Sequence, residues 1–260
     1  MTRNGNGFGN GVHHGRPPGR VIGTAGGGLV GAGSTWAANA HVAKLGEDGE
    51  KATARILDPI ALAPGGPTVI HDVRIPIPKF TANIDHIVVS GNTIHLIDAK
   101  SWAAGRYVRA PKFLGGKVYR DWKRFEPGEK QTMQMALEAM TRFMVSKNVR
   151  CTFATPIVVV WPTSTKKSLN MSFFSMTGAN MINSARLAAF AKRYKKTANP
   201  AIVAALMSLV NGTADHNTPV PAFRPEVDPF APAPDFSKDE FGVSVSDRRF
   251  PNQDPFNEEF

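Results

Sequence analysis

The chain has almost no cysteine. Cys151 is the single cysteine among 260 residues. One thiol excludes an internal disulfide and a zinc cluster built from several cysteines. We interpret Cys151 as a small apolar residue without a catalytic role.

Long hydrophobic runs are also missing from the sequence. No segment approaches the roughly 18 consecutive apolar residues of a membrane-spanning helix, and the first residues lack the apolar core of a secretory signal. We therefore expect a cytoplasmic protein with no membrane partner.

Acidic residues are scarce in most of the chain. The whole sequence has 31 basic and 21 acidic residues, a net charge of +10, but ten of the acids lie in residues 212–260 with only four basic residues. Residues 1–211 therefore have 27 basic and 11 acidic residues, a net charge of +16. Such a charge favours binding of a polyanion, and nucleic acid is the first candidate.

The two ends of the chain differ in composition from its middle. Residues 1–34 contain twelve glycines, and the sequence predicts a flexible, basic, Gly-rich arm over 1–35. Residues 212–260 are rich in Pro, Asp and Glu with isolated Phe residues, which predicts a disordered acidic tail. The folded domain is expected at 36–211.

Helical and strand patterns alternate within this domain. Apolar spacing predicts a helix at 35–60, or a broken pair of helices because Gly46 and Gly49 weaken its middle. A strand is expected from Thr68 up to Pro76 and Pro78. Further strands are expected at 151–162 and, at the sheet edge, at 171–177; further helices are expected at 129–147, 180–195 and 199–211. Strands mixed with helices around a sheet predict an α/β fold.

A charged hairpin is expected, with strands at 84–89 and 93–99. Gly91 and Asn92 favour a two-residue turn between two β-branched strands, and this turn sets Ser90 opposite Thr93. The same register sets Asp85 opposite Asp98, with Lys100 two residues farther along the same face.

Three ionisable groups at one sheet end require a physical reason. Two facing carboxylates repel each other by several kcal/mol unless a proton, a cation or Lys100 intervenes. Carboxylate oxygens suit Mg²⁺ or Mn²⁺, and carboxylates, a divalent ion and an ammonium are what phosphodiester hydrolysis requires. The alternative is a simple Asp–Lys–Asp ion cluster, since D-x-K also occurs by chance.

Four segments of the sequence stand out together: GEDGEKATARIL at 46–57, VIHDVRIP at 69–76, NIDHIVV at 83–89 and IHLIDAKSWAAGR at 94–106. They resemble the nuclease-related domain (NERD) family of the PD-(D/E)XK nuclease superfamily. The resemblance covers about residues 44–161. It implies a restriction-endonuclease-like mixed central sheet flanked by helices, and metal-dependent hydrolysis of DNA with Mg²⁺ or Mn²⁺ as cofactor.

The resemblance also implies roles for individual residues. Asp85, Asp98, Glu50 and the Ala99 carbonyl correspond to metal ligands, and Lys100 corresponds to the motif lysine. Glu47 competes with Glu50, since both lie on one helix face. Gln131, with Gln134 as its competitor, corresponds to a catalytic glutamine. Asp98 departs from the Glu that many superfamily members have at this position.

Residues 106–130 combine basic and aromatic side chains in a stretch that we expect to be rich in loops. They could hold a phosphate backbone and stack on unpaired bases, or form a solvated loop whose aromatic residues anchor it to the core. The predicted nucleic-acid-binding residues are Arg106, Arg109, Lys112, Lys117, Arg120, Lys123 and Arg124.

Some alternatives stay open at this point. His86 and His95 alternate away from the carboxylates, so they are not expected in the site. The substrate could be RNA, or the domain could be a degenerate module that binds nucleic acid or recruits a partner. The acidic tail ending at Phe260 could dock a protein partner.

Overall fold

The structure is a computed structural model that describes residues 16–26, 40–111, 116–126, 132–164, 168–174, 176 and 178–210. All of them belong to Met1–Val220, the first of two units into which the chain divides. Among these residues, no helix is both long and apolar enough to cross a membrane. The predicted tail at 212–260 and most of the predicted arm at 1–35 lie outside the described residues.

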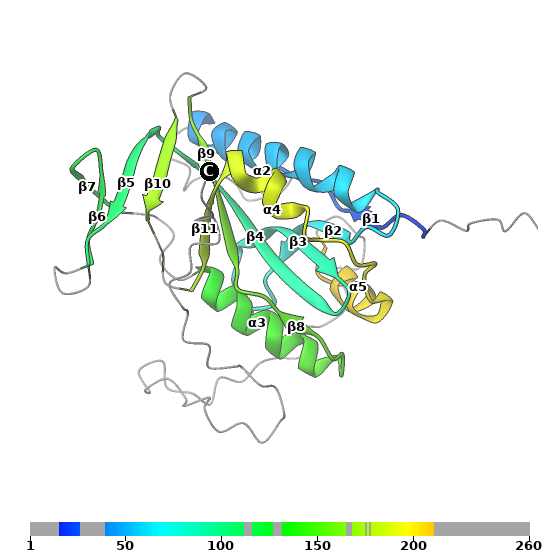
Figure 1. The fold of residues 1–260 in the computed structure, drawn as a ribbon. Helices are drawn as coiled ribbons and strands as arrows, with labels where there is room; N and C mark the ends of the chain where they lie inside the picture. The colour runs from blue at the N-terminus through cyan, green and yellow to red at the C-terminus, as the bar shows by residue number, and fades with distance from the viewer. Residues whose placement is uncertain are drawn as a thin grey trace, which may run out of the picture. The chain divides into compact units, whose positions relative to one another are not determined.

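A mixed sheet forms the centre of this unit (Figure 1). Strands β1 and β2, β4 and β9, and β9 and β11 pair parallel, whereas β2, β3 and β4 pair antiparallel. A short strand, β8, also pairs with β4. In spatial order the main strands are β1 (Arg20–Ile22), β2 (Thr68–Arg74), β3 (Asn83–Ser90), β4 (Thr93–Trp102), β9 (Ile157–Pro162) and β11 (Asn180–Asn183), with β8 at Thr152–Phe153.

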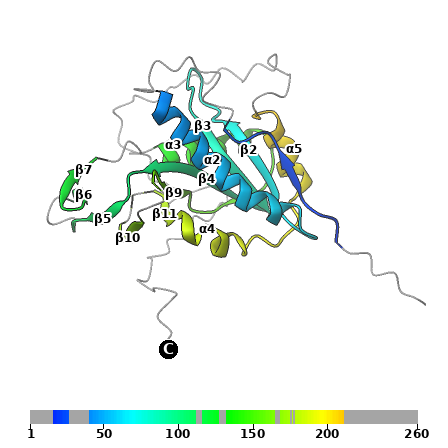
Figure 2. The same cartoon turned by 90° about the horizontal axis from the view of Figure 1, so that it is seen from above.

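Helices cover both faces of this sheet (Figures 1 and 2). On one face, α2 (Ala40–Ala61) and α4 (Ser184–Ala191) pack on a core that includes Val88 and Ile97. On the other face, α3 (Thr132–Ser146) and α5 (Pro200–Met207) pack on a separate core. Both faces of the central strands are therefore buried, as their long β-branched runs require. The predicted α/β fold with a mixed central sheet flanked by helices is confirmed.

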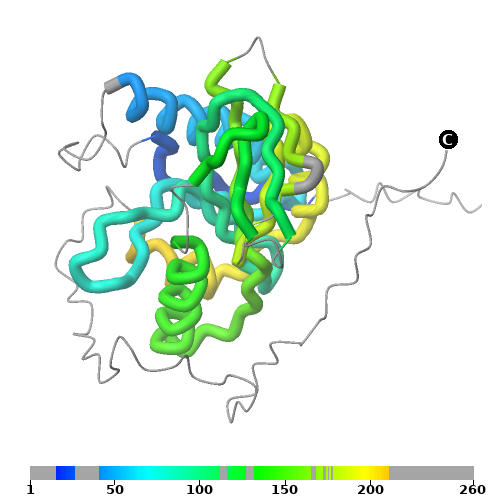
Figure 3. The backbone as a smooth tube through the Cα atoms, turned by 90° about the vertical axis from the view of Figure 1, so that its left-hand side faces the viewer, coloured from blue at the N-terminus to red at the C-terminus, as the bar shows by residue number. Residues whose placement is uncertain are grey.

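A second sheet follows β4, where the sequence predicted loops. Its strands are β10 (Leu169–Phe173), β5 (Gly105–Arg109), β6 (Val118–Arg120) and β7 (Lys123–Phe125), in this spatial order. Figure 3 views the chain from the side of this sheet. The loop prediction was wrong, and so was the placement of 171–177 at the edge of the central sheet. The pattern was hard to recognise because β6 and β7 are only three residues each and join through a turn without glycine.

Two other sequence predictions need correction. Residues 20–22, predicted as part of the flexible arm, form β1 because they pair with β2 and bury Ile22. Residues 180–183, predicted to start a helix, form β11, and the helix starts only at Ser184, where Asn183 caps it. In both cases pairing with a neighbouring strand outweighs the local preference.

Helix α2 is continuous through Gly49. A Cβ at Gly49 would lie 2.9 Å from the Ser101 Oγ atom on β4, so the glycine allows the helix to approach the sheet. Burial of the helix against the sheet therefore outweighs the poor helix propensity of glycine. The alternative of a broken pair of helices was wrong.

Candidate active site

The β3–β4 hairpin has the predicted register. Ser90 pairs with Thr93, and the ladder continues to the pair His86 and Ile97. The turn includes Gly91 at φ 62°, a conformation that glycine adopts without strain. The next position on each strand is Asp85 and Asp98.

Asp85 and Asp98 lie where the regular ladder ends. The Asp85 Oδ2 atom accepts a hydrogen bond of 2.7 Å from the Ala99 backbone amide. Asp98 is 5% exposed. Lys100, farther along β4, places its Nζ atom 2.6 Å from the Asp98 Oδ2 atom. The side chain of Lys100 is 34% exposed, so its ammonium lies between the buried Asp98 carboxylate and solvent.

Glu50 joins this group from helix α2. Its Oε2 atom accepts a hydrogen bond of 3.0 Å from the Gly26 backbone amide. Lys100, Asp72 and Asp98 are close enough to affect its charge. Glu47 instead forms an ion pair with Lys51 on the surface of the helix. Of the two acids that the sequence left open, Glu50 is the one that the structure brings to the cluster.

Polar contacts hold α2 against β4 and β9 and thereby position Glu50. The Ser101 hydroxyl donates to the Leu45 carbonyl oxygen at 2.6 Å. The indole nitrogen of Trp161 donates to the Thr53 hydroxyl oxygen at 2.8 Å, and that hydroxyl donates to the Gly49 carbonyl oxygen at 2.9 Å. These contacts lie on both sides of Glu50 along the helix, so they fix its backbone position relative to β4, while the Gly26 amide holds its carboxylate.

The electrostatics of the cluster favour protons or cations. Burial, with Asp72 and Asp98 nearby, raises the pKa of Glu50 to about 7, although Gly26 and Lys100 lower it in part. Burial and then Asp98 raise the pKa of Asp85 well above its usual value, while Lys100 and the Ala99 amide oppose the shift. One ammonium therefore does not compensate fully for the acids gathered here.

Asp72 is a fourth acid at this place, and the sequence reasoning gave it no role. The pairs His71 with His86 and Val73 with Ile84 place Asp72 on β2 beside Asp85 on β3. Asp72 has φ 53°, and its Oδ1 atom accepts a hydrogen bond of 2.8 Å from the Asn83 side-chain amide. An alignment of β2 with β3 would have been needed to find it, because no short turn fixes that register.

The histidines of the central sheet have other contacts. His86 and His71 approach each other at 2.8 Å between their Nδ1 atoms, and the His71 Nε2 atom lies 2.9 Å from the Asp58 Oδ1 atom. Burial lowers the pKa of both imidazoles. His95 packs on the Tyr194 ring with 4.6 Å between centroids.

Two predicted residues cannot be placed. Gln131 and Lys112 lie outside the described residues, so their roles stay predictions. The competing glutamine, Gln134, donates its side-chain amide to Glu138 at 3.3 Å on the surface of α3. Of the other predicted nucleic-acid-binding residues, Arg106, Lys117, Lys123 and Arg124 are exposed, and Arg109 and Arg120 are half-buried.

The chemistry of this cluster suits a divalent ion only if the site is open, with some of the ligands supplied from outside the protein. In the part of the chain that the structure describes, no group of three or more His, Cys, Asp or Glu side chains is arranged to hold a metal. The donors available are hard carboxylate oxygens whose mutual repulsion a cation would relieve. Magnesium sites often use only one or two carboxylates and complete their ligands with water and phosphate.

The match to a family model agrees with this geometry. Residues 45–160 match the model described as nuclease-related domain, NERD. This part of the chain is a nuclease-related domain. Its range contains Glu50, Asp85, Asp98 and Lys100, and also β5, β6 and β7 of the second sheet. No curated protein and no solved structure matches the chain. The family that the sequence resembled is thereby confirmed, whereas the roles of individual site residues stay predictions.

Proposed function

We propose that this nuclease-related domain hydrolyses phosphodiester bonds of DNA with the help of Mg²⁺ or Mn²⁺. The observation that carries the proposal is the meeting of Glu50, Asp85 and Asp98 around Lys100. Carboxylates from a helix and two strands converge there although burial and repulsion raise the pKa values of Glu50 and Asp85. A fold tolerates such unfavourable placement mostly where it serves a function.

The residues of the cluster would have distinct tasks. Asp85 and Asp98, with Glu50 and the Ala99 carbonyl as further oxygen donors, would hold the ion. When bound, a divalent ion would neutralise charge on the phosphate and make water a better nucleophile. In the hydrolysis, the oxygen of water bonds to phosphorus and the bond from phosphorus to the leaving oxygen breaks, giving a phosphate monoester and a hydroxyl.

Lys100 is the residue best placed to act on the reacting groups. Its ammonium is partly exposed and is held 2.6 Å from Asp98. From there it can donate a hydrogen bond to the attacking water or to a phosphate oxygen, where negative charge develops. Asp98 would position this ammonium as well as share in holding the ion.

The test is cleavage of plasmid and linear DNA with Mg²⁺, with Mn²⁺ and with EDTA. We expect cleavage with either ion, none with EDTA, and none by the Lys100→Ala variant. An RNA substrate in the same assay distinguishes a ribonuclease. Tight binding of DNA without cleavage under any of these conditions would reject the proposal in favour of a degenerate binding module.

A further inference from the structure

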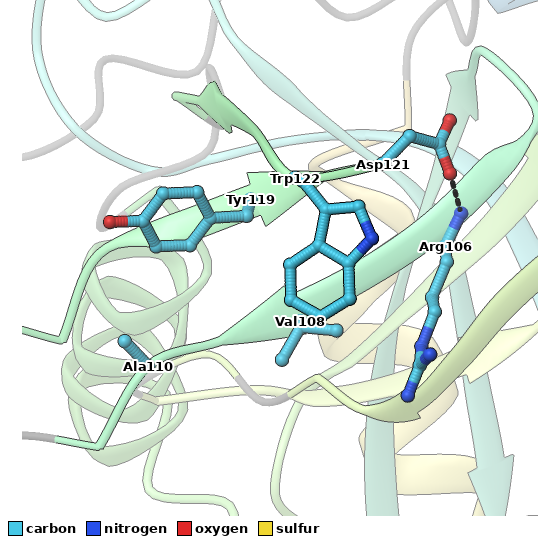
Figure 4. A pocket seen from close by; sticks show the side chains of 6 residues that line it. All are labelled: Arg106, Val108, Ala110, Tyr119, Asp121 and Trp122. Atoms are coloured by element: carbon cyan, nitrogen blue, oxygen red, sulfur yellow. Dashed lines mark hydrogen bonds between the residues drawn. The ribbon is translucent and has the colours of Figure 1, made fainter.

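A pocket opens on the outer face of the second sheet. Its volume is about 460 Å³, and Figure 4 shows the side chains around it. This volume is within the range of small-ligand sites, roughly 300 to 1,000 Å³. The pocket is lined by Arg106, Val108, Ala110, Tyr119, Asp121 and Trp122.

The second sheet has two different faces. On the inner face, Tyr107 is fully buried and packs against Trp102, Phe125 and Phe174. On the outer face, Trp122 is 81% exposed. The aromatic residues on the inner face therefore anchor the sheet to the core, as one of the two sequence hypotheses expected. Trp122 contributes little to the core.

The positive φ angle of Trp122 indicates that this residue does not stabilise the fold. Asp121 and Trp122 form the two-residue turn between β6 and β7, with φ 49° and 67°. Turns of this type favour Asn-Gly or Asp-Gly, because both central residues need positive φ. A bulky residue held in this conformation costs free energy, which is typical of functional positions.

A positive charge lies beside this aromatic surface. Figure 4 shows the Trp122 indole between the Tyr119 ring and the Arg106 side chain. The Arg106 guanidinium carbon lies 5.8 Å from the centroid of the Trp122 ring. The Asp121 carboxylate accepts a hydrogen bond of 2.8 Å from the Arg106 backbone amide, which holds the turn against β5. Lys117, which alternation along the chain places on the same face as Tyr119, is exposed. A flat aromatic ring attached to an anion would be complementary to such a surface.

We propose that this pocket binds an unpaired nucleobase of a single-stranded nucleic acid, stacked on Trp122 beside Tyr119, with Arg106 near its phosphate. Bases within a duplex stack on one another and leave no face for Trp122, so the base must be unpaired. This proposal rests on the proposed nuclease function. It identifies single-stranded nucleic acid as the substrate class of the carboxylate cluster.

The pocket is close enough to the carboxylate cluster for one strand of nucleic acid to contact both. Arg106 follows Lys100 by six residues, and only Ala103 and Ala104 separate β4 from β5. Six extended residues span at most about 20 Å. At roughly 3.4 Å per stacked nucleotide, about six nucleotides reach from one site to the other.

The test uses fluorescein-labelled oligothymidylate, with EDTA present so that no cleavage occurs. Trp122→Gly removes the ring and creates the Asp-Gly pair that this turn favours, so the variant should fold. We expect its affinity for the oligonucleotide to fall about ten-fold, the effect of losing one stacked base. Tyr119→Ala should weaken binding less, and Trp122→Phe should retain most of it.

The controls separate stacking from charge and from the chemistry. Arg142→Ala, on the exposed surface of α3, should leave binding unchanged, and affinity for a blunt duplex of the same length should not respond to Trp122→Gly. Equal affinity of Trp122→Gly and the wild type for the oligonucleotide would overturn the proposal, as would an equal loss for the duplex. Ring-dependent binding without cleavage by the wild type would reject only the nuclease function.

Discussion

The carboxylate cluster and the outer face of the second sheet are opposites. The cluster is acidic and largely buried, and it raises the pKa values of its own members. On the outer face of the second sheet, the Arg106 guanidinium lies beside the exposed ring of Trp122. Both arrangements are unfavourable in the free protein, and a phosphate-bearing strand with its divalent ions would relieve both. The comparison teaches that the proposed binding and the proposed chemistry lie in separate regions and can be tested apart.

The Asp98→Asn variant is expected to show the largest difference between its effect on cleavage and its effect on binding. Loss of this charge removes a predicted ion ligand and the partner that holds Lys100, so cleavage should fall by about a thousand-fold or more. Binding of oligonucleotide in EDTA should change little, because the second sheet is untouched. The two measurements are a plasmid-nicking assay and fluorescence anisotropy. A parallel loss of binding and cleavage would show that the two regions are not separable.

The next effect concerns stability and the protonation of Glu50. Its pKa is raised from 4.5 to about 7, so between these values the folded state binds more protons than the unfolded state. The free energy of unfolding therefore falls as the pH rises from 4.5 to 7 and stays lower above that. We expect Glu50→Gln to remove this part of the pH dependence and to stabilise the protein by about 3 kcal/mol at pH 8 in EDTA, since each pKa unit corresponds to about 1.4 kcal/mol.

Urea unfolding at several pH values measures this effect. Glu47→Gln is the matched control, since Glu47 is on the same helix but pairs with Lys51. If the free energy of unfolding depends on pH in the same way for Glu50→Gln and the wild type, the pKa of Glu50 is not raised in the folded protein. Addition of Mg²⁺ should raise the melting temperature of the wild type more than that of Glu50→Gln.

A smaller effect is expected where α2 meets β4. An alanine at Gly49 would force the Ser101 hydroxyl from its hydrogen bond with Leu45, at a cost of about 1 kcal/mol. In a Ser101→Ala background that bond is already absent, so Gly49→Ala should be neutral or stabilising through helix propensity. A double-mutant cycle by urea unfolding checks this change of sign. Additive effects would contradict the close approach that positions Glu50.

The smallest effect concerns phosphate contacts at the second sheet. If Arg106 neutralises one phosphate, Arg106→Ala should reduce the slope of log affinity against log salt concentration by about 1. Arg142→Ala should leave the slope unchanged. Titrations of the labelled oligonucleotide at several salt concentrations give both slopes, and equal slopes for Arg106→Ala and the wild type would place the phosphate elsewhere.

The charged hairpin was the part of the site most open to prediction. Gly91 and Asn92 fix the register of β3 against β4, and the register extends from the turn to His86 and Ile97. Strand alternation added Lys100 to the same face, and the family resemblance then pointed to a helix acid. The choice between Glu47 and Glu50 stayed open, because helical spacing places both on one face and only packing decides which meets the sheet.

The sequence by itself determined the α/β fold, the nuclease-related family and the hairpin, because these depend on patterns within short segments. Only the tertiary structure decided that Glu50 and Asp72 join the cluster and that β5, β6 and β7 form a two-faced sheet with β10. The physical reason is that these features come from contacts between segments far apart in the chain. Ser101 against α2, Asp72 beside Asp85, and Tyr107 against Phe174 are such contacts.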